Sequence, residues 1–265
     1  MFQVGGFFDT FLSALHERLG LTYGVRALTQ KVCLLYPEDE GLRIVYYRCG
    51  AGRRIAVAGE GRCIHVDEDL CATRLDLSVS RIAALTGHVQ RVYARDTVAA
   101  RIEKRIARSF LQEHHLQVDL PGKYRYGLYH DGELVAVAVF SGGRRMVDKP
   151  ADYRSYELLR FCHKQGAHVV GGFSKLLKAF WREFNPGDIM TYVDKDWSDG
   201  TSYRKLGFTL VGETEPQLFW VDTRTMQRYY ERTLPPEIAE MPPDERPAVG
   251  YEAVYNNGSF KAVYF

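Results

Sequence analysis

The stretch VVGGFSKLLKAF, residues 169–180, places two adjacent glycines between an apolar run and an amphipathic helical pattern. Glycine lowers the stability of a helix, so a glycine pair at a helix start indicates that another group must come close to the backbone there. The first amides of a helix lack an intrahelical acceptor and lie at the positive end of its dipole, which suits a phosphate. On spacing alone, close packing of the helix against a neighbouring element is an equally good explanation.

Residues 88–222 around this stretch predict a mixed α/β domain. The apolar pattern alternates between the period of a strand and that of a helix, and Asp131-Gly132 is a dipeptide typical of a tight hairpin. The expected order is a strand at 89–95, a helix at 97–114, a hairpin around Asp131, a strand at 154–163, a helix at 172–183, a strand at 188–194, a short helix ending at Gly207, and strands at 208–213 and 217–222. This order predicts an α+β or mixed α/β fold with a central, largely antiparallel sheet and crossover helices.

The flanking sequence predicts a small N-terminal α/β unit at 1–87 and a C-terminal extension at 223–265. A helix is expected at 7–19, because apolar residues recur there at helical spacing and Gly20 is a plausible stop. The other expected elements are strands at 31–37, 42–49 and 53–59, a helix at 77–87, a short helix at 224–232, a proline-rich connector at 235–247 and a hairpin around YNNGSF, 255–260.

The composition sets few limits on function. Lysine and arginine number 35 and aspartate and glutamate 33, so the overall charge neither requires nor excludes a polyanionic partner. The N-terminal stretch lacks the features of a signal peptide, and no apolar run approaches the roughly 20 residues that span a bilayer. We therefore expect a cytoplasmic protein without a membrane partner.

The five cysteines are irregularly spaced and include no Cys-x-x-Cys pair, which argues against a zinc or redox motif. Cys63, His65 and Cys71 could in principle share a metal ion. Reduced thiols in a half-buried sheet explain these residues more simply. We therefore expect no metal.

A second stretch, YVDKDWSDGTSYRKLGF at 192–208, places Tyr203 on a short helix after a buried strand. Together with HVVGGFSKLL at 168–177, it resembles the GNAT acyltransferase superfamily, whose pyrophosphate loop has the form Gln/Arg-x-x-Gly-x-Gly/Ala before a helix. His168 and Gly171 fall on the first two signature positions, and Tyr-x-x-Leu-Gly-Phe matches well. The ordered motifs over 78–222 further resemble a phage-associated GNAT-like domain that is often attached to endonuclease-type segments.

The resemblance implies an acyl-CoA-dependent N-acyltransferase that transfers an acyl group, expected to be acetyl, directly from the thioester to an amine. The backbone around the glycine pair would bind the pyrophosphate of acetyl-CoA, with Lys175 or His168 adding charge. The residues assigned to the cofactor are His168, Val170, Gly171, Gly172, Phe173, Ser174 and Lys175. Tyr203 would protonate the departing thiolate, and either Glu157 or the competing imidazole of His115 would remove a proton from the amine.

Two other functions stay open. One is a nucleic-acid base-modifying enzyme on the same fold, resembling the Mom-type phage proteins. It rests on the phage resemblance and on a basic face of the expected helix 97–114, formed by Arg101, Lys104, Arg105 and Arg108. The other is a noncatalytic binding module, because Phe173 stands where the signature has a small residue.

The proposed catalytic residues also have ordinary alternatives. Tyr203 could pack under the sheet, and Glu157 could pair with Arg154 or Arg160 as a strand salt bridge. His115 adjoins a helix C-terminus, where an imidazolium is favourable without any catalysis.

Overall fold

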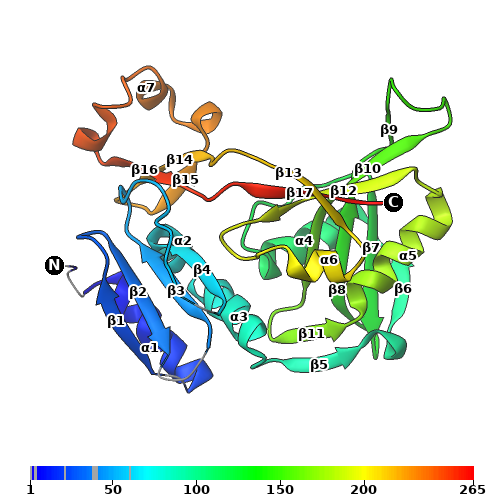
Figure 1. Cartoon of the computed structure of the whole chain (residues 1–265), viewed down its shortest axis with the longest axis horizontal. Coiled ribbons are helices and arrows are strands. Elements are labelled where there is room, and N and C mark those ends of the chain that lie inside the picture. The colour runs from blue at the N-terminus through cyan, green and yellow to red at the C-terminus, as the bar shows by residue number, and fades with distance from the viewer. Residues whose placement is uncertain (1, 3–4, 21, 38–40, 60) are drawn as a thin grey trace. The chain divides into compact units, whose positions relative to one another are not determined.

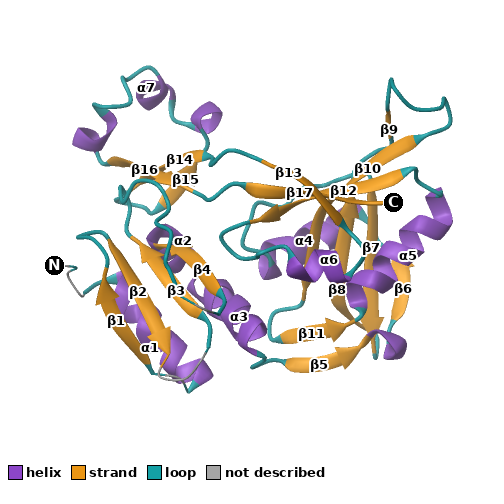
Figure 2. Cartoon of the chain, viewed as in Figure 1, coloured by secondary structure: helices purple, strands orange, loops and turns teal. Residues whose placement is uncertain are grey.

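The computed structural model describes every residue except 1, 3–4, 21, 38–40 and 60. The chain divides into two compact units, each built from separate stretches of sequence. Unit 1 contains Met1–Thr86, Asp194–Asp199 and Thr214–Ser259, and unit 2 contains Gly87–Val193, Gly200–Glu213 and Phe260–Phe265. Figure 1 follows the elements along the chain by colour, and Figure 2 separates helices from strands.

Unit 2 is built around an eight-stranded sheet in which the main path runs β13-β17-β12-β10-β8-β7-β6, with the short β9 paired to β10. Its strands are β6 (Val98–Arg101), β7 (Tyr124–His130), β8 (Glu133–Phe140), β9 (Arg144–Arg145), β10 (Arg154–His163), β12 (Asp188–Asp194), β13 (Thr209–Glu213) and β17 (Ser259–Tyr264). Its helices are α4 (Lys104–His114), α5 (Gly172–Phe184) and α6 (Thr201–Lys205), with the 3₁₀ turn η1 at Ala94–Asp96. The pairs β6–β7, β7–β8, β8–β10 and β13–β17 are antiparallel, and β10–β12 is parallel.

Helices α4 and α5 cover opposite faces of this sheet (Figure 2). Successive side chains of a strand point to opposite faces. In β8, Phe140 therefore packs against Phe180 of α5, with stacked rings 4.0 Å apart between centroids. The preceding Val139 belongs to the apolar cluster that contains Phe110 of α4. The expected mixed α/β fold, with a largely antiparallel sheet and helices that cross over it, is confirmed.

Strands β10 and β12 are parallel neighbours joined through helix α5, as a parallel pair requires. Their ladder ends early, at Glu157 opposite Met190. Beyond it the Thr191 hydroxyl donates to the Leu158 carbonyl at 2.9 Å. The connecting strand β11 (Ala167–Val170) lies outside the large sheet and pairs in parallel with β5 (Gln90–Tyr93).

Unit 1 contains a small α/β layer, as expected for the N-terminal region. Its four-stranded sheet has the order β1 (Tyr23–Ala27), β2 (Val32–Pro37), β3 (Arg43–Tyr47) and β4 (Cys63–Asp67), with β3 and β4 parallel. Helices α1 (Phe7–Leu19), α2 (Glu68–Thr73) and α3 (Leu75–Thr86) accompany it. The rest of unit 1 is a sheet of order β15 (Gln227–Tyr229), β14 (Leu218–Asp222) and β16 (Tyr251–Tyr255), helix α7 (Pro236–Ala239), and 3₁₀ turns η2 (Glu231–Thr233) and η3 (Arg246–Val249).

Elements with strong local signals are confirmed. The helix expected at 7–19 is α1, and Gly20 ends it in the left-handed conformation with φ 64°. The hairpin turn falls at Asp131 and Gly132, both with positive φ. Helix α5 buries Phe173, Leu176, Leu177 and Phe180, which is the apolar face that the sequence predicts.

Four expected elements are wrong, because long-range pairing overrides the local pattern. The helix at 97–114 is shorter, since Val98–Arg101 pairs with β7 as a strand and α4 starts at Lys104. Residues 53–59 form no strand and instead contribute bonds from Arg54 and Ile55. The helix expected at 224–232 is replaced by β15, which pairs with β14 in an antiparallel arrangement, and by the 3₁₀ turn η2.

The expected hairpin around 255–260 is the fourth. Its two strands, β16 and β17, pair with β14 and β13, which lie in different sheets. The C-terminal strand β17 thus lies between β12 and β13, while β14 pairs outside the large sheet. The two units consequently differ from the expected segments 1–87, 88–222 and 223–265. The difference begins after residue 193, because residues 194–199 and 214–259 pack with the N-terminal region.

Candidate functional site

The glycine pair lies where the sequence places it, between β11 and α5. Gly171 is the N-cap of α5, with φ 76° and ψ 3°, a left-handed conformation that favours glycine. It is exposed, and a Cβ at this position would meet only the Ala94 side chain, at 3.5 Å. The left-handed backbone of the turn, and not crowding by a neighbour, therefore explains the glycine at 171.

Gly172 has a different reason for being a glycine. It is buried, and a Cβ there would lie 2.9 Å from the Cβ of Val169 and 3.1 Å from Leu128. Close packing thus explains the second glycine, whereas the first one opens the helix end. The two explanations that the sequence left open apply to different members of the pair.

The first turn of α5 presents backbone amides. No side chain caps the helix at Gly171. The Lys175 amide donates to the Gly171 carbonyl at 3.0 Å, so it is already engaged within the helix. The preceding amides, those of Gly172, Phe173 and Ser174, have no intrahelical acceptor by the geometry of a helix. These three donors are the ones that an anion could meet.

Lys175 and His168, the two side chains expected to add positive charge, interact with other groups of the protein. The Lys175 ammonium donates to the carbonyls of Ala94, at 2.7 Å, and Thr97, which ties η1 to the helix. Partial burial and the nearby Arg91 charge lower the pKa of His168 below its usual 6.5, so the imidazole is neutral at pH 7. Val170, also assigned to the cofactor, is exposed in β11 opposite Tyr93.

Phe173 points away from the helix end and into the apolar core. Only 8% of it is exposed, and its ring contacts those of Phe161, Tyr203 and Phe208, with centroids 4.7, 5.6 and 5.9 Å away. Its side chain therefore does not stand in front of the free amides. The same contacts bring Tyr203, on α6, next to the first turn of α5.

Glu157 lies in β10 at the point where the ladder with β12 ends. Its neighbours Tyr156 and Leu158 belong to the core cluster on the α5 face, so by alternation Glu157 faces the other side of the sheet. Burial raises its pKa, while the charges of Arg144 and Arg160 oppose the rise. A carboxylate with a raised pKa is a stronger base than an ordinary one.

The structure does not bring His115 to the Tyr203 side of the sheet. His115 is the residue after α4, on the face opposite α5, and its Nδ1 accepts a hydrogen bond from the Gln117 amide at 3.1 Å. This bond stabilises the turn that follows the helix.

The basic face predicted for the helix at 97–114 is divided. Arg101 lies in β6 and pairs with Glu183 at 3.0 Å, and Arg108 pairs with Asp119 at 2.6 Å. Lys104 and Arg105 are exposed on α4. Half of the expected basic face is thus neutralised by acidic partners.

The candidate metal ligands Cys63, His65 and Cys71 are buried or half-buried, and His65 contacts another side chain. Nδ1 of His65 contacts the Tyr47 hydroxyl at 2.9 Å, and burial lowers the pKa of His65 to about 4. Burial also raises the pKa of the Cys63 and Cys71 thiols. Within the described part of the chain, no group of three or more histidine, cysteine, aspartate or glutamate side chains is placed to hold a metal ion. In the same part of the chain, no helix is both long and apolar enough to cross a membrane.

Sequence reasoning missed the residues that surround α5 from outside its own motif. The turn η1, which begins at Ala94, lies beside Gly171, and it carries the exposed Arg95. Thr191 bridges β10 and β12 where their ladder ends. Arg95 and Thr191 lie far from the glycine pair in sequence, and no local pattern marks either one.

No protein-family model matches the chain, and no curated protein sequence matches it significantly. Among solved structures it is similar to the histone acetyltransferase HPA2 and related acetyltransferase from Corynebacterium glutamicum, with 11% identity, coverage of 63% of this chain and 95% of that one, and a TM-score of 0.38. Ard1 from Thermoplasma volcanium is 13% identical to this chain, the match covers 63% of this chain and 96% of that one, and the TM-score is 0.35. An IAA acetyltransferase from Bacillus cereus is 12% identical to this chain, the match covers 63% of this chain and 98% of that one, and the TM-score is 0.35. At TM-scores this low, the similarities carry no argument about activity, which has to come from this chain's own residues.

Proposed function

We propose that unit 2 is an acyl-CoA-dependent N-acyltransferase that transfers an acetyl group directly to an amine. One observation carries the proposal. The free amides at the start of α5 and the Tyr203 ring lie on the same face of the sheet, joined by the contact between Phe173 and Tyr203. A ligand that binds the amides through its pyrophosphate would extend toward a phenol able to donate a proton.

The chain's own residues fit the phosphates of coenzyme A. Gly171 adds no side chain at the start of the helix, and the amides of Gly172, Phe173 and Ser174 would donate to the pyrophosphate oxygens. Arg95, 80% exposed in the adjacent turn and 3.7 Å from the Asp96 carboxylate, would supply positive charge, because the Lys175 ammonium is bound to backbone carbonyls. Bound acyl-CoA would supply the activated acyl group as a thioester.

The proton transfers fall to two side chains. An amine must lose a proton to attack a carbonyl, and Glu157, with its raised pKa, would accept that proton. The Tyr203 hydroxyl would donate a proton to the leaving thiolate. Glu157 lies in β10 where the ladder with β12 ends, on the sheet face opposite α5. His115 follows α4 and lies, like Glu157, on the sheet face opposite α5, but its Nδ1 already accepts a hydrogen bond from the Gln117 amide, so it is the weaker candidate for the base.

Calorimetric titration with acetyl-CoA tests the proposal, using Gly171→Asp with Gly171→Asn as its matched control. Asp and Asn both tolerate the left-handed conformation better than other side chains, and the Cβ of each would meet the same neighbour, Ala94, at an ordinary contact distance. Only the carboxylate repels a pyrophosphate. We expect wild type and Gly171→Asn to bind and Gly171→Asp to lose binding by about tenfold or more. Absence of binding by wild type, or equal binding by both variants, contradicts the proposal.

The acceptor defines the second candidate function. Lys104 and Arg105, exposed on α4, would bind the phosphate backbone of a nucleic acid, with a base as the acceptor, in an enzyme that resembles the Mom-type phage proteins. DNA binding that weakens steeply with salt, because phosphate contacts release counterions, would support it. Binding that is absent at low salt would leave a small amine or a peptide, in a cytoplasmic setting, as the acceptor.

A further inference from the structure

The C-terminal end of β17 lies beside helix α5 (Figure 1), where the rings of Tyr264 and Trp181 are in contact. The two elements enclose a partly open cavity of about 350 Å³, a volume within the range of small-molecule sites. Its lining, all from unit 2, consists of Leu177, Lys178, Trp181, Arg182, Tyr264 and Phe265. Arg182 lies in the last turn of α5, so about 15 Å of helix separates it from the free amides of the first turn.

Both charged side chains of this cavity are positive. Lys178 and Arg182 are four positions apart, so they share one side of α5, where like charges repel each other. Both are exposed, and neither forms an ion pair or a side-chain hydrogen bond with another described residue. The acidic residue of the same helix, Glu183, pairs with Arg101 instead, at 3.0 Å. The cavity thus carries two positive charges that lack a carboxylate partner among the described residues.

Aromatic rings form most of the apolar wall of the cavity. The Trp181 and Tyr264 rings meet edge to face with centroids 5.3 Å apart, and the Tyr264 ring also contacts Phe208 of the core, at 5.3 Å. These contacts hold the two rings in place before any ligand binds. Phe265, which lines the same cavity, is 71% exposed. The cavity therefore offers aromatic surface next to two positive charges.

We propose that this cavity binds a small aromatic phosphate monoester, such as a nucleoside 5′-monophosphate. A phosphate monoester carries a charge of about −1.5 to −2 at pH 7, which complements the two positive charges of Lys178 and Arg182. Its oxygens suit the forked N–H groups of a guanidinium. The attached ring packs against Trp181 and Phe265. Free phosphate would leave the aromatic wall uncovered, and an uncharged ring would leave both positive charges unpaired.

Calorimetric titration of the full chain with AMP tests the proposal, with adenosine and inorganic phosphate titrated separately as the two parts of the ligand. AMP should bind at least about tenfold more tightly than either part, because only AMP both pairs the charges and covers the rings. Equal affinity for AMP and inorganic phosphate would show that the cavity is only a basic patch, which overturns the proposal. Equal affinity for AMP and adenosine overturns it as well.

Two variants test the charge and the ring separately. Arg182→Gln should weaken AMP binding about tenfold or more, because a charge-assisted contact to phosphate is lost. Phe265→Ala should weaken it about fivefold or more through lost stacking, and the exposure of this ring makes the change safe for folding. Arg105→Gln is the matched control, because it removes the same charge from an exposed position on α4, on the opposite face of the sheet. Unchanged affinity in either cavity variant, or equal weakening in Arg105→Gln, overturns the proposal.

Acetyl-CoA separates this cavity from the proposed active site, because coenzyme A itself contains a phosphorylated adenosine. The cavity proposal does not rest on the proposed function, since none of the lining residues is assigned to acetyl-CoA. AMP should bind equally well in the presence of saturating acetyl-CoA and in Gly171→Asp. Competition between the two ligands, or loss of AMP binding in Gly171→Asp, would show that AMP occupies the cofactor site and overturns the cavity proposal. Absence of acetyl-CoA binding by wild type contradicts only the proposed function and leaves the AMP result valid.

Discussion

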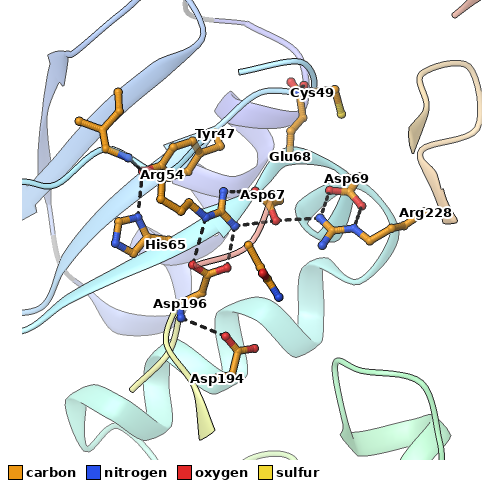
Figure 3. A network of polar contacts seen from close by, with 12 residues as sticks. Tyr47, Cys49, Arg54, His65, Asp67, Glu68, Asp69, Asp194, Asp196 and Arg228 are labelled. Atoms are coloured by element: carbon orange, nitrogen blue, oxygen red, sulfur yellow. Dashed lines mark hydrogen bonds and ion pairs between the residues drawn. The ribbon is translucent and has the colours of Figure 1, made fainter. Parts of the chain in front are cut away.

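The two units are stabilised by different kinds of interior. In unit 2, aromatic rings fill the space between α5 and the sheet, and Phe180 alone contacts Phe140, Tyr156 and Phe184. In unit 1, a row of ion pairs joins Asp196, Arg54, Asp67, Arg228 and Asp69 (Figure 3), and every side chain of this row except that of Arg228 is at most 7% exposed. A cavity in an aromatic core costs packing energy, whereas removal of one partner from a buried ion pair leaves an uncompensated charge. Unit 2 therefore depends on packing around α5, whereas unit 1 depends on a continuous set of charged partners.

The aromatic core should show the largest effect. Phe180→Ala removes a fully buried ring stacked on Phe140, and we expect a loss of about 3–5 kcal/mol in the free energy of unfolding. Denaturant unfolding measures it, with Lys178→Ala, an exposed position on the same helix, as the control. A loss no larger than that of the control would mean that α5 does not depend on this core.

The centre of the ion-pair row comes next. Asp67→Asn preserves the shape but leaves Arg54 and Arg228 each short of one carboxylate, for an expected loss of about 3 kcal/mol. Asp76→Asn is the matched control, because Asp76 forms a surface pair with Arg18 and is 72% exposed, where pairs contribute about 0–1 kcal/mol. Similar losses in the two variants would show that burial does not strengthen the row.

The pH dependence of unit 1 sharpens the comparison further. Burial, with the neighbouring Asp194 and Asp67 carboxylates, raises the pKa of Asp196 to about 7 against the opposing charge of Arg54. The folded state then holds this proton more tightly than the unfolded chain does, so the contribution of Asp196 to stability falls as pH rises from about 4 to about 7. Asp196→Asn removes this slope. The stability difference between wild type and variant should change by at most about 1.4 kcal/mol per pH unit in that window. Parallel stability curves would contradict the raised pKa.

The glycine pair gives the smallest effects. Gly172→Ala places a Cβ against Val169 and should cost about 1–3 kcal/mol, whereas Gly171→Ala costs about 1 kcal/mol through its left-handed backbone alone. Thermal unfolding of both variants measures the difference. A larger loss for Gly171→Ala would reverse the roles assigned to the two glycines.

Sequence patterns predicted the parts of the fold whose signals are local. Helix α5, its glycine N-cap and the turn at Asp131 each depend on residues within a few positions, so their periodicity and turn chemistry sufficed. The apolar run at 53–59 looked like a strand, but the partners of Arg54 are 13 and 142 residues away and hold it in a loop. The strand β17 likewise pairs with β13, about 50 residues earlier, and not with its neighbour β16.

The candidate site divides in the same way. The sequence placed Gly171 at the start of one helix and Tyr203 on a short second helix, and both positions agree with the structure. The surroundings of Lys175 and His168 could not be read from the sequence, because the carbonyls that accept from Lys175 belong to Ala94 and Thr97 and the arginine that acts on His168 lies in β5. Charge at a site depends on tertiary neighbours, which periodicity does not encode.

The most direct test of the central claim is to follow the backbone amide resonances of unit 2 while acetyl-CoA is added. The account predicts that the amides of Gly172, Phe173 and Ser174 shift on binding, that Tyr203 is affected with them, and that Gly171→Asp abolishes the shifts. Saturable binding that moves resonances elsewhere and leaves the first turn of α5 unchanged would contradict it.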